Sequence, residues 1–234
     1  MTAKIKITKA EQKLIEQLVT HYSDNQTIVK VMLDQLSSAI LNSSKLMAHV
    51  HSTKSRLKDP THLEDKLLRK LKGEKAKGQK FEILKENLFS KINDLAGFRI
   101  LHLHTEQIVS IDRELRAVFE EFRFPLLEPP TARTWDDESE AFFQKCGIAT
   151  IKSPRMYTSV HYVIESNSST KATCEIQVRT LAEELWGEVD HTMNYPHECT
   201  QLSCREQIKV LARATSTCSR LVDSIFRTYE DDKS

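Results

Sequence analysis

Stretches with the two-residue period of a β-strand alternate along this chain with stretches of helical period. The strand-like stretches are residues 46–58, 97–104, 160–165 and 172–180, and the helical patterns cover residues 9–22, 28–40, 60–72, 82–91, 105–121 and 201–230. Strands interleaved with helices form a layered fold in which the helices pack on a sheet. The sequence therefore predicts an α/β or α+β fold with a mixed sheet of four to five strands flanked by helices.

The composition is typical of a globular protein. Apolar residues make up 39% of the 234 residues, and the formal net charge is +1. No stretch approaches the roughly 20 consecutive apolar residues of a membrane span, and the first residues show no secretory signal. We therefore expect a cytoplasmic protein that is not bound to a membrane, in which a local cluster of cations holds any anionic ligand.

The patterns divide the chain into three regions. We expect an N-terminal helical hairpin in residues 1–45, a central core in residues 46–196 and a C-terminal helix in residues 197–234. Two segments of the core lack a clear period. We expect residues 73–80 to form a charged loop and residues 131–147 to form a flexible insertion.

Five cations are predicted to converge where the first core strand meets the helix that follows it. They are Arg56, Lys58, Lys66, Arg69 and Lys70. The two strand residues share a face, and the three helical residues lie within about one turn. Guanidinium and ammonium groups together suit a polyphosphate. A solvated helix face is the other interpretation of the same residues.

An aspartate, a glycine and an arginine mark the entry to the second core strand. Asp94 could bind Mg²⁺ there, Gly97 would permit close approach of another group to the backbone, and Arg99 shares the face of Gly97. An ordinary turn is the other interpretation of this pattern.

Three polar residues alternate with apolar residues in the last core strand. Glu175, Gln177 and Arg179 lie on one face of this strand, and Ile176 and Val178 lie on the other. A polar face of this kind is either exposed to solvent or binds a ligand. The carboxylate could be a second metal ligand or a base in a phosphoryl-type transfer.

Four motifs in the chain resemble motifs of one enzyme family, in the same order. They are Arg56-x-Lys58-x-x-x-His62-Leu63-x-x-Lys66, Asp94-Leu-Ala-Gly97-Phe-Arg99, Tyr157-x-Ser159-x-His161 and Glu175-Ile-Gln-Val-Arg-Thr180, and they are followed by Trp186, Glu188, His191 and Tyr195. Residues 46–196 are thereby similar to the synthetase domain of the RelA/SpoT family of (p)ppGpp (alarmone) synthetases, in particular to its small stand-alone members.

This resemblance implies a nucleotidyltransferase-like synthetase domain and an activity. The family transfers pyrophosphate from ATP to the ribose 3′-hydroxyl of GDP or GTP, which releases AMP and makes (p)ppGpp for the stringent response. It also implies a role for each matching residue. Arg56 and Arg99 would enclose adenine, Lys58, Lys66 and Arg69 would bind the ATP phosphates, Asp94 and Glu175 would be catalytic and bind Mg²⁺, and Tyr157, Ser159, His161, Gln177 and Arg179 would bind the acceptor.

The acceptor motif departs from the family pattern. Arg155 and Met156 stand where the family usually has Asn and Gly before the tyrosine that stacks on guanine, and His62 replaces a usual Ser. Two other functions therefore remain open. The first is a toxin-type synthetase, with an antitoxin as partner, that modifies the tRNA 3′ end or an adenine nucleotide. The second is an inactive nucleotide-binding regulatory module.

The resemblance also bears on hydrolysis and assembly. The family's hydrolase domain carries a His-Asp motif, and this sequence contains no His-Asp pair, so we expect synthesis alone. Small members often form tetramers through terminal helices, and the apolar stripe of residues 201–230 could join copies in this way. The interpretation that we favour places this stripe on the protein's own sheet.

Overall fold

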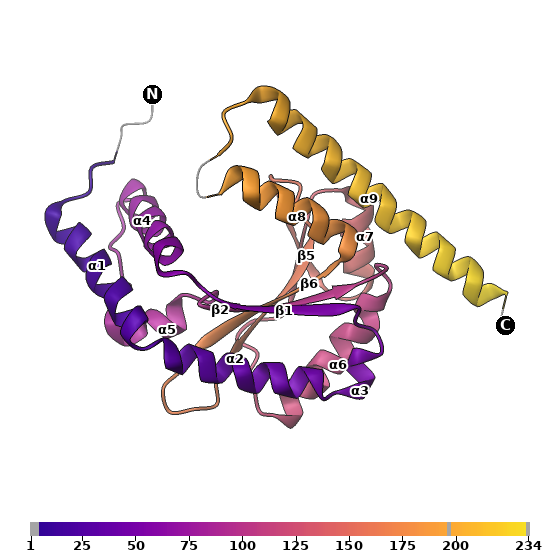
Figure 1. Cartoon of the computed structure of the whole chain (residues 1–234), viewed down its shortest axis with the longest axis horizontal. Helices are drawn as coiled ribbons and strands as arrows, with labels where there is room; N and C mark the ends of the chain where they lie inside the picture. The colour runs from indigo at the N-terminus through magenta and orange to yellow at the C-terminus, as the bar shows by residue number, and fades with distance from the viewer. Residues whose placement is uncertain (1–4, 196–197, 233–234) are drawn as a thin grey trace.

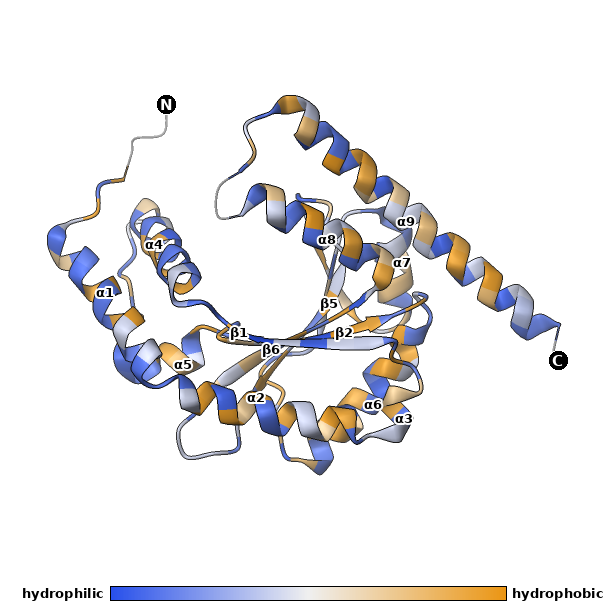
Figure 2. Ribbon diagram, viewed as in Figure 1, coloured by the Kyte–Doolittle hydropathy of each residue, from blue (hydrophilic) through white to orange (hydrophobic). Residues whose placement is uncertain are grey.

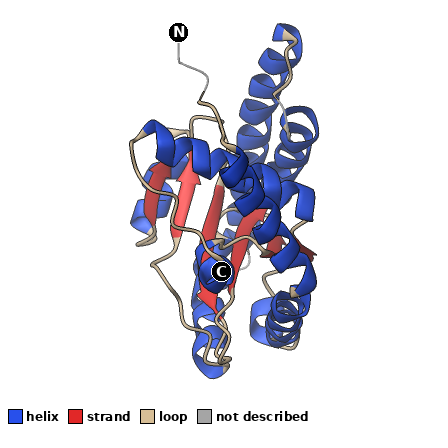
Figure 3. Ribbon diagram, turned by 90° about the vertical axis from the view of Figure 1, so that its left-hand side faces the viewer, coloured by secondary structure: helices blue, strands red, loops and turns tan. Residues whose placement is uncertain are grey.

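Six β-strands form one mixed sheet in the computed structural model, which describes residues 5–195 and 198–232. The strands are β1 (Ser52–Leu57), β2 (Ala96–His102), β3 (Thr131–Thr134), β4 (Ala149–Lys152), β5 (Ser159–Glu165) and β6 (Thr173–Thr180). They lie in the order β1-β2-β6-β5-β3-β4. The β2/β6 and β3/β4 pairs are parallel, and the other neighbours are antiparallel. Figure 3 shows the strands of the sheet side by side among the helices. The predicted mixed sheet flanked by helices is confirmed, with six strands instead of four to five.

Helices flank this sheet on both faces (Figure 1). They are α1 (Lys9–Asp24), α2 (Gln26–Leu41), α3 (Ser44–Met47), α4 (Pro60–Ala76), the 3₁₀ turn η1 (Lys85–Asn87), α5 (Leu88–Lys91), α6 (Gln107–Glu121), α7 (Asp137–Lys145), α8 (Leu181–Asn194) and α9 (Leu202–Asp231). Local signals explain several of their starts. Thr8 and Glu11 form a capping box on α1, and the Asp59 side chain caps α4 with Pro60 in its first turn.

The hydrophobic core lies between one face of the sheet and helices α2 and α6 (Figure 1). Ile100, Ile176 and Val178 of the central strands are almost fully buried in it. Each such side chain contributes about 1.5–3 kcal/mol when it leaves water. Because this face is filled with apolar side chains, the polar residues of the same strands are left on the opposite face.

The two N-terminal helices occur as predicted, but they pack on different neighbours and not along each other as a hairpin. Helix α1 lies against α4, while α2 crosses β1, β2 and β6. The Tyr22 hydroxyl of α1 donates to the Lys58 carbonyl at 2.7 Å. This contact fixes the junction between β1 and α4. The division of the chain at residues 45 and 196 stays a prediction.

Three segments differ from the sequence-based expectations. Residues 131–147 form β3 and α7 and are not a flexible insertion, because Asp136 caps α7 and three acidic residues follow in its first turn. The expected loop at 73–80 starts only after Ala76, since Lys75 ties the last turn of α4 to Glu11 at 2.8 Å. The strand expected over 46–58 begins at Ser52, after the short helix α3.

Helix α9 packs on α8 and not on the sheet, which corrects the interpretation favoured from the sequence. The Trp186 indole of α8 donates to the Ile208 carbonyl at 3.1 Å. Much of the predicted apolar stripe faces solvent, with Leu221 at 60% and Ile225 at 57% exposure, and Figure 2 shows apolar residues recurring along the helix. Assembly into a tetramer through this helix stays a prediction.

Among the described residues, no helix combines the length and hydropathy that a membrane crossing requires.

Candidate functional site

Strand register gathers the predicted polar residues on the face of the sheet opposite α2 and α6. Residues that are directly paired on neighbouring strands project to the same side. Two adjacent rows cross the sheet from β1 in this way: Lys54, Arg99, Gln177 and His161, and Arg56, Gly97 and Glu175. Residues far apart in the chain therefore meet on one polar surface.

Asp94 is held by two of the predicted cations. Lys58 Nζ lies 2.9 Å from Asp94 Oδ2, and Lys66 Nζ lies 2.7 Å from Oδ1. Burial favours the neutral acid, but the two ammonium groups outweigh it and lower the pKa of Asp94. Arg69 lines the same cavity as Lys58 and Lys66, whereas Lys70 lines a separate one.

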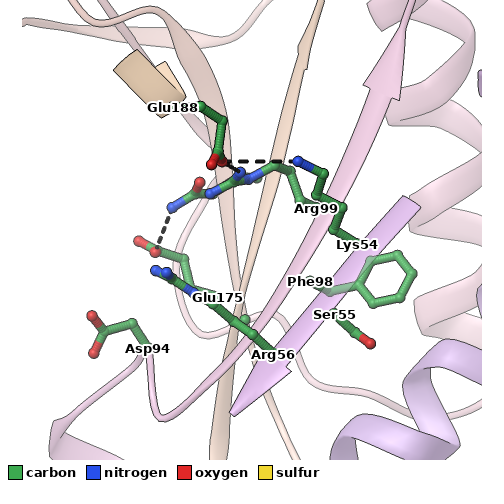
Figure 4. A pocket seen from close by; sticks show the side chains of 10 residues that line it. Lys54, Ser55, Arg56, Asp94, Phe98, Arg99, Glu175 and Glu188 are labelled. Carbon is green, nitrogen blue, oxygen red and sulfur yellow. Dashed lines mark hydrogen bonds and ion pairs between the residues drawn. The ribbon is translucent and has the colours of Figure 1, made fainter. Parts of the chain in front are cut away.

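Arg56 and Arg99 reach the polar surface from neighbouring strands. The Arg56 side chain crosses Gly97, where an added Cβ would lie 3.5 Å from Arg56 Cγ. Arg99 Nη1 donates to Glu184 Oε1 at 2.7 Å and to Glu188 Oε1 at 2.6 Å. Figure 4 shows Glu188 beside both Arg99 and Lys54. The Arg99 guanidinium is thus bound through its N–H edge, and its flat faces take no part in these bonds.

Glu175 accepts hydrogen bonds from two neighbours on the same face. Its Oε1 lies 3.0 Å from His161 Nδ1, and Gln177 Nε2 donates to Oε2 at 2.9 Å. Burial opposes ionisation, but His161 and Gln177 lower the pKa of Glu175 to about 2. A carboxylate with such a low pKa is a poor base near neutral pH. The geometry therefore favours a ligand or orienting role for Glu175 over proton removal.

Tyr157 stands among aromatic and cationic groups beside this surface. The Arg179 guanidinium carbon lies 5.5 Å from its ring centroid, and the rings of His161 and Trp186 lie 5.7 and 6.2 Å away. Ser159 does not join the site. It is 1% exposed and donates to the Val178 carbonyl at 3.2 Å, so it holds β5 to β6.

The loop before Tyr157 keeps a glycine-like backbone. Met156 has a φ of 60°, in the left-handed region that glycine enters freely and other residues enter at a cost. Its side chain packs on the cluster around Trp186. Arg155 lines the cavity and pairs with Glu198 at 2.6 Å. The departure from the family motif therefore places Met156 on a backbone conformation that suits glycine and adds the Arg155 side chain at the rim.

Three adjoining cavities cover this surface, and all three are lined by Arg56 and Asp94. The cavity that also contains Tyr157 and Glu175 has a volume of about 610 Å³, and the one lined by Lys58, Lys66 and Arg69 has about 490 Å³. Every residue with a catalytic or binding role implied by the sequence, except Ser159, lines at least one of the three. The two binding regions predicted from the sequence are therefore continuous in space.

Asp94 and Glu175 are suitable ligands for Mg²⁺. Both carboxylates line the same cavity, and the described residues contain no cluster of three or more His, Cys, Asp or Glu side chains placed to bind a metal. Mg²⁺ commonly takes one or two carboxylates and completes its shell with water and substrate phosphates, unlike a structural zinc. The residues present fit this mode of binding.

An aromatic group at the end of α8 has no role assigned from the sequence. The Tyr195 ring stacks on His191 with centroids 4.7 Å apart and meets the edge of His62 at 4.7 Å, and Arg69 lies 5.9 Å from its centroid. These four side chains line the cavity that also contains Lys58 and Lys66. They bring α8 and α4 together over the predicted phosphate site.

Helix α8 as a whole was missed in the sequence analysis, together with Glu184, which pairs with three cations of the sheet. The sequence does contain a signal for the start of this helix, because Thr180 and Glu183 form a capping box. The same signal at Thr8 and Glu11 correctly predicted α1. From Thr180 onward it would have predicted a helix that carries Glu184 and Glu188 on one face.

Comparison with known proteins identifies relatives of this chain. A family described as a region found in RelA and SpoT proteins matches residues 55–200. The GTP pyrophosphokinase YwaC of Bacillus subtilis (strain 168) is 27% identical over 198 residues, which cover 76% of this chain and 81% of that protein.

Solved structures share the fold. The small alarmone synthetase 1 of Bacillus subtilis, bound to its product pppGpp, superimposes with a TM-score of 0.57 at 19% identity and covers 95% of this chain and 100% of that one. A GTP pyrophosphokinase family protein from Streptococcus pneumoniae gives a TM-score of 0.54 at 14% identity, with 97% of each chain covered.

Proposed function

This chain belongs to the RelA/SpoT family, and on that premise we propose that it transfers the terminal pyrophosphate of ATP to the ribose 3′-hydroxyl of GDP or GTP. One observation carries the proposal. The cation-lined pocket around Asp94 is continuous with the pocket around Tyr157, so a donor and an acceptor nucleotide can meet above Glu175. The relative named GTP pyrophosphokinase supports the same reaction.

The reaction needs charge neutralisation more than it needs a strong base. The 3′-oxygen of the acceptor bonds to the β-phosphorus of ATP, the bond from that phosphorus to the α-phosphate oxygen breaks, AMP leaves, and the hydroxyl proton passes to water. Lys58, Lys66 and Arg69 stabilise the negative charge on the phosphates. A Mg²⁺ ion held by Asp94 and Glu175 would neutralise phosphate oxygens further.

On the donor side, the open faces of the two arginines provide a site for adenine. Arg56 and Arg99 project from paired strands into the same cavity. A guanidinium plane stacks well on an aromatic base. The adenine would therefore lie between these side chains, with its phosphates directed towards Lys58 and Lys66.

On the acceptor side, Tyr157 provides an aromatic face for guanine, and Arg179, Gln177 and His161 lie beside it. Arg155 at the rim adds a cation that the usual family motif lacks. The tRNA 3′ end and adenine nucleotides therefore remain as competing acceptors. Since these nucleotides are cytoplasmic, we propose that the protein acts in the cytoplasm.

A label-transfer assay tests the proposal. Purified protein is incubated with Mg²⁺ and ATP labelled on its terminal phosphates, in parallel with GDP, GTP, ATP alone and bulk tRNA. We expect label to move to the guanine nucleotides and to remain there on long incubation, because we propose synthesis without hydrolysis. Label on tRNA alone, or on an adenine nucleotide alone, would replace this function with the toxin-type one. No transfer to any acceptor would favour an inactive nucleotide-binding module.

The substitution Asp94→Asn tests the site itself. It removes a carboxylate that two lysines and the proposed Mg²⁺ share, so transfer should fall by at least about a hundredfold. Asp34→Asn is the matched control, because Asp34 lies on α2, across the sheet from the site, is 61% exposed, and among the described residues has an ion pair with Lys30 alone. Equal activity of the two variants would show that Asp94 has been assigned wrongly.

A further inference from the structure

A buried carboxylate on α8 connects the three strands that carry the site. Glu184 is 6% exposed. Its Oε1 lies 2.7 Å from Lys54 Nζ and 2.7 Å from Arg99 Nη1, and its Oε2 lies 2.5 Å from Arg179 Nη2. These partners come from β1, β2 and β6, so one side chain reaches across half of the sheet.

The carboxylate carries a negative charge at neutral pH. Burial alone would raise the pKa of Glu184, but Lys54, Arg179 and Arg99 lower it to about 2. Glu184 lines none of the three cavities. It can therefore act on a bound nucleotide only through the cations that it holds.

Arg179 depends on α8 for its position. Its side chain is 3% exposed, its Nε has no hydrogen-bond partner among the described residues, and its single ion pair there is with Glu184. The guanidinium lies against Gly187, where an added Cβ would come within 2.4 Å of Nη1. The other side of this group faces the Tyr157 ring at 5.5 Å. Residues of α8 thus determine where Arg179 lies beside Tyr157, the proposed stacking partner of the acceptor base.

Arg99 also pairs with Glu188, which can be compared with Glu184. Glu188 lies one turn after Glu184, is 53% exposed, and pairs with Arg99 at 2.6 Å and with Lys54 at 3.9 Å. Its ion pairs among the described residues thus lie on the donor side alone. Glu184 alone of the two also reaches Arg179.

We propose that Glu184 is a positioning residue that fixes Arg99 on the donor side and Arg179 on the acceptor side with one carboxylate. Because Glu184 binds the N–H edge of Arg99, the faces of Arg99 stay free for a base, while its ion pair with Arg179 holds that guanidinium against the Tyr157 ring. The donor and acceptor pockets are then held at a fixed separation before either nucleotide binds. This inference rests on the proposed transfer between two nucleotides.

Three variants separate the two sides of the site. Glu188→Gln should raise the KM for ATP alone. Gly187→Ala should push the Arg179 guanidinium aside and raise the KM for the guanine nucleotide alone. Glu184→Gln should raise both KM values, each by roughly tenfold, since a hydrogen bond to a charged group contributes about 1.5–3 kcal/mol. Steady-state kinetics with each substrate varied, together with thermal unfolding of every variant, supply the measurements.

The outcomes are distinct. A Glu184→Gln variant with a lower melting temperature but unchanged KM values would overturn the positioning role, and so would an effect on one substrate alone. If this variant does not fold, the other two variants still test the inference. Glu188→Gln must raise the KM for ATP alone and Gly187→Ala must raise the KM for the guanine nucleotide alone, and the inference fails without both effects. Absence of transfer by the wild-type protein would overturn the proposed function instead. Calorimetric binding of ATP and GTP to the same variants would then decide the role of Glu184.

Discussion

Tyr157 shows how a single side chain sets the acceptor pocket. Its ring lines the cavity with the Arg179 guanidinium 5.5 Å from its centroid, and burial raises the pKa of its hydroxyl, so the phenol stays neutral. A neutral ring backed by a cation is suited to stacking on a purine. The phenol oxygen is not needed for that contact.

Replacement of Tyr157 therefore has two separable results. Tyr157→Ala removes the stack and should raise the KM for the guanine nucleotide by about tenfold to a hundredfold, since stacking of a base on an aromatic side chain contributes about 1–3 kcal/mol. Tyr157→Phe keeps the ring and should stay within about threefold of wild type. The test is a titration of GTP at saturating ATP. Equal losses in both variants would assign the effect to the hydroxyl and not to stacking.

The sequence predicted site residues correctly where the two-residue period of a strand determines which side chains share a face. The alternation in β6 placed Glu175, Gln177 and Arg179 on the face that lines the cavity. Ser159 was expected at the acceptor only because of its place in the family-like motif, and a motif gives the position of a residue in the chain and not its depth in the fold. The strand period could not reveal Glu184, because two of its three partners, Lys54 and Arg99, lie on strands that are distant in the chain.

At the scale of elements, the first turn of α8 both pairs with the sheet and caps its own N-terminus. Glu184 pairs with the sheet, while its neighbour Glu183 completes the capping box by accepting from the Thr180 backbone N–H at 2.9 Å. Burial raises the pKa of Glu183 to about 7. A group whose pKa is raised from 4.5 in the folded state stabilises the fold below pH 4.5, and this stability is lost as the pH rises through about 7.

Glu183→Gln should remove the loss of stability that occurs as the pH rises through about 7. Glutamine completes a capping box equally well and has no charge to bury. The free energy of unfolding at about pH 8 should rise by about 2 kcal/mol, with little change at about pH 4.5. Urea denaturation of the wild-type protein and the variant at the two pH values measures this change in the free energy of unfolding. Glu183→Ala is the control for the cap, because it removes the charge and the cap together and should be less stable than Glu183→Gln at both pH values. A constant effect of the glutamine variant across pH would contradict the prediction.

Among the elements, helices with strong end signals could be predicted and short strands could not. The capping box at Thr8 and the proline after Asp59 correctly predicted α1 and α4. Strands β3 and β4 have four residues each, too few for a period to be visible. They are defined by pairing with β5 and with each other, which is a tertiary effect.

For the whole molecule, the buried His102 and the half-buried Glu183 give the stability opposite dependences on pH. Burial lowers the pKa of His102 from 6.5 to about 4. Its neutral form therefore stabilises the fold above pH 6.5, and this stability is lost as the pH falls towards 4. Glu183 acts in the opposite sense between pH 4.5 and about 7. Between pH 4.5 and 6.5 the two effects oppose each other.

The wild-type free energy of unfolding should therefore be nearly constant between about pH 4.5 and 6.5, because each group alone changes it by up to about 1.4 kcal/mol per pH unit. Glu183→Gln should expose the dependence on His102, so that this variant loses about 1 kcal/mol per unit as the pH falls. Urea denaturation of both proteins at three pH values across the window measures the two slopes. Parallel curves would show that Glu183 does not titrate there. Below about pH 4.5 both proteins should lose stability together, because Glu175 and Glu184, with pKa values of about 2, keep their present hydrogen bonds and ion pairs only while they are ionised.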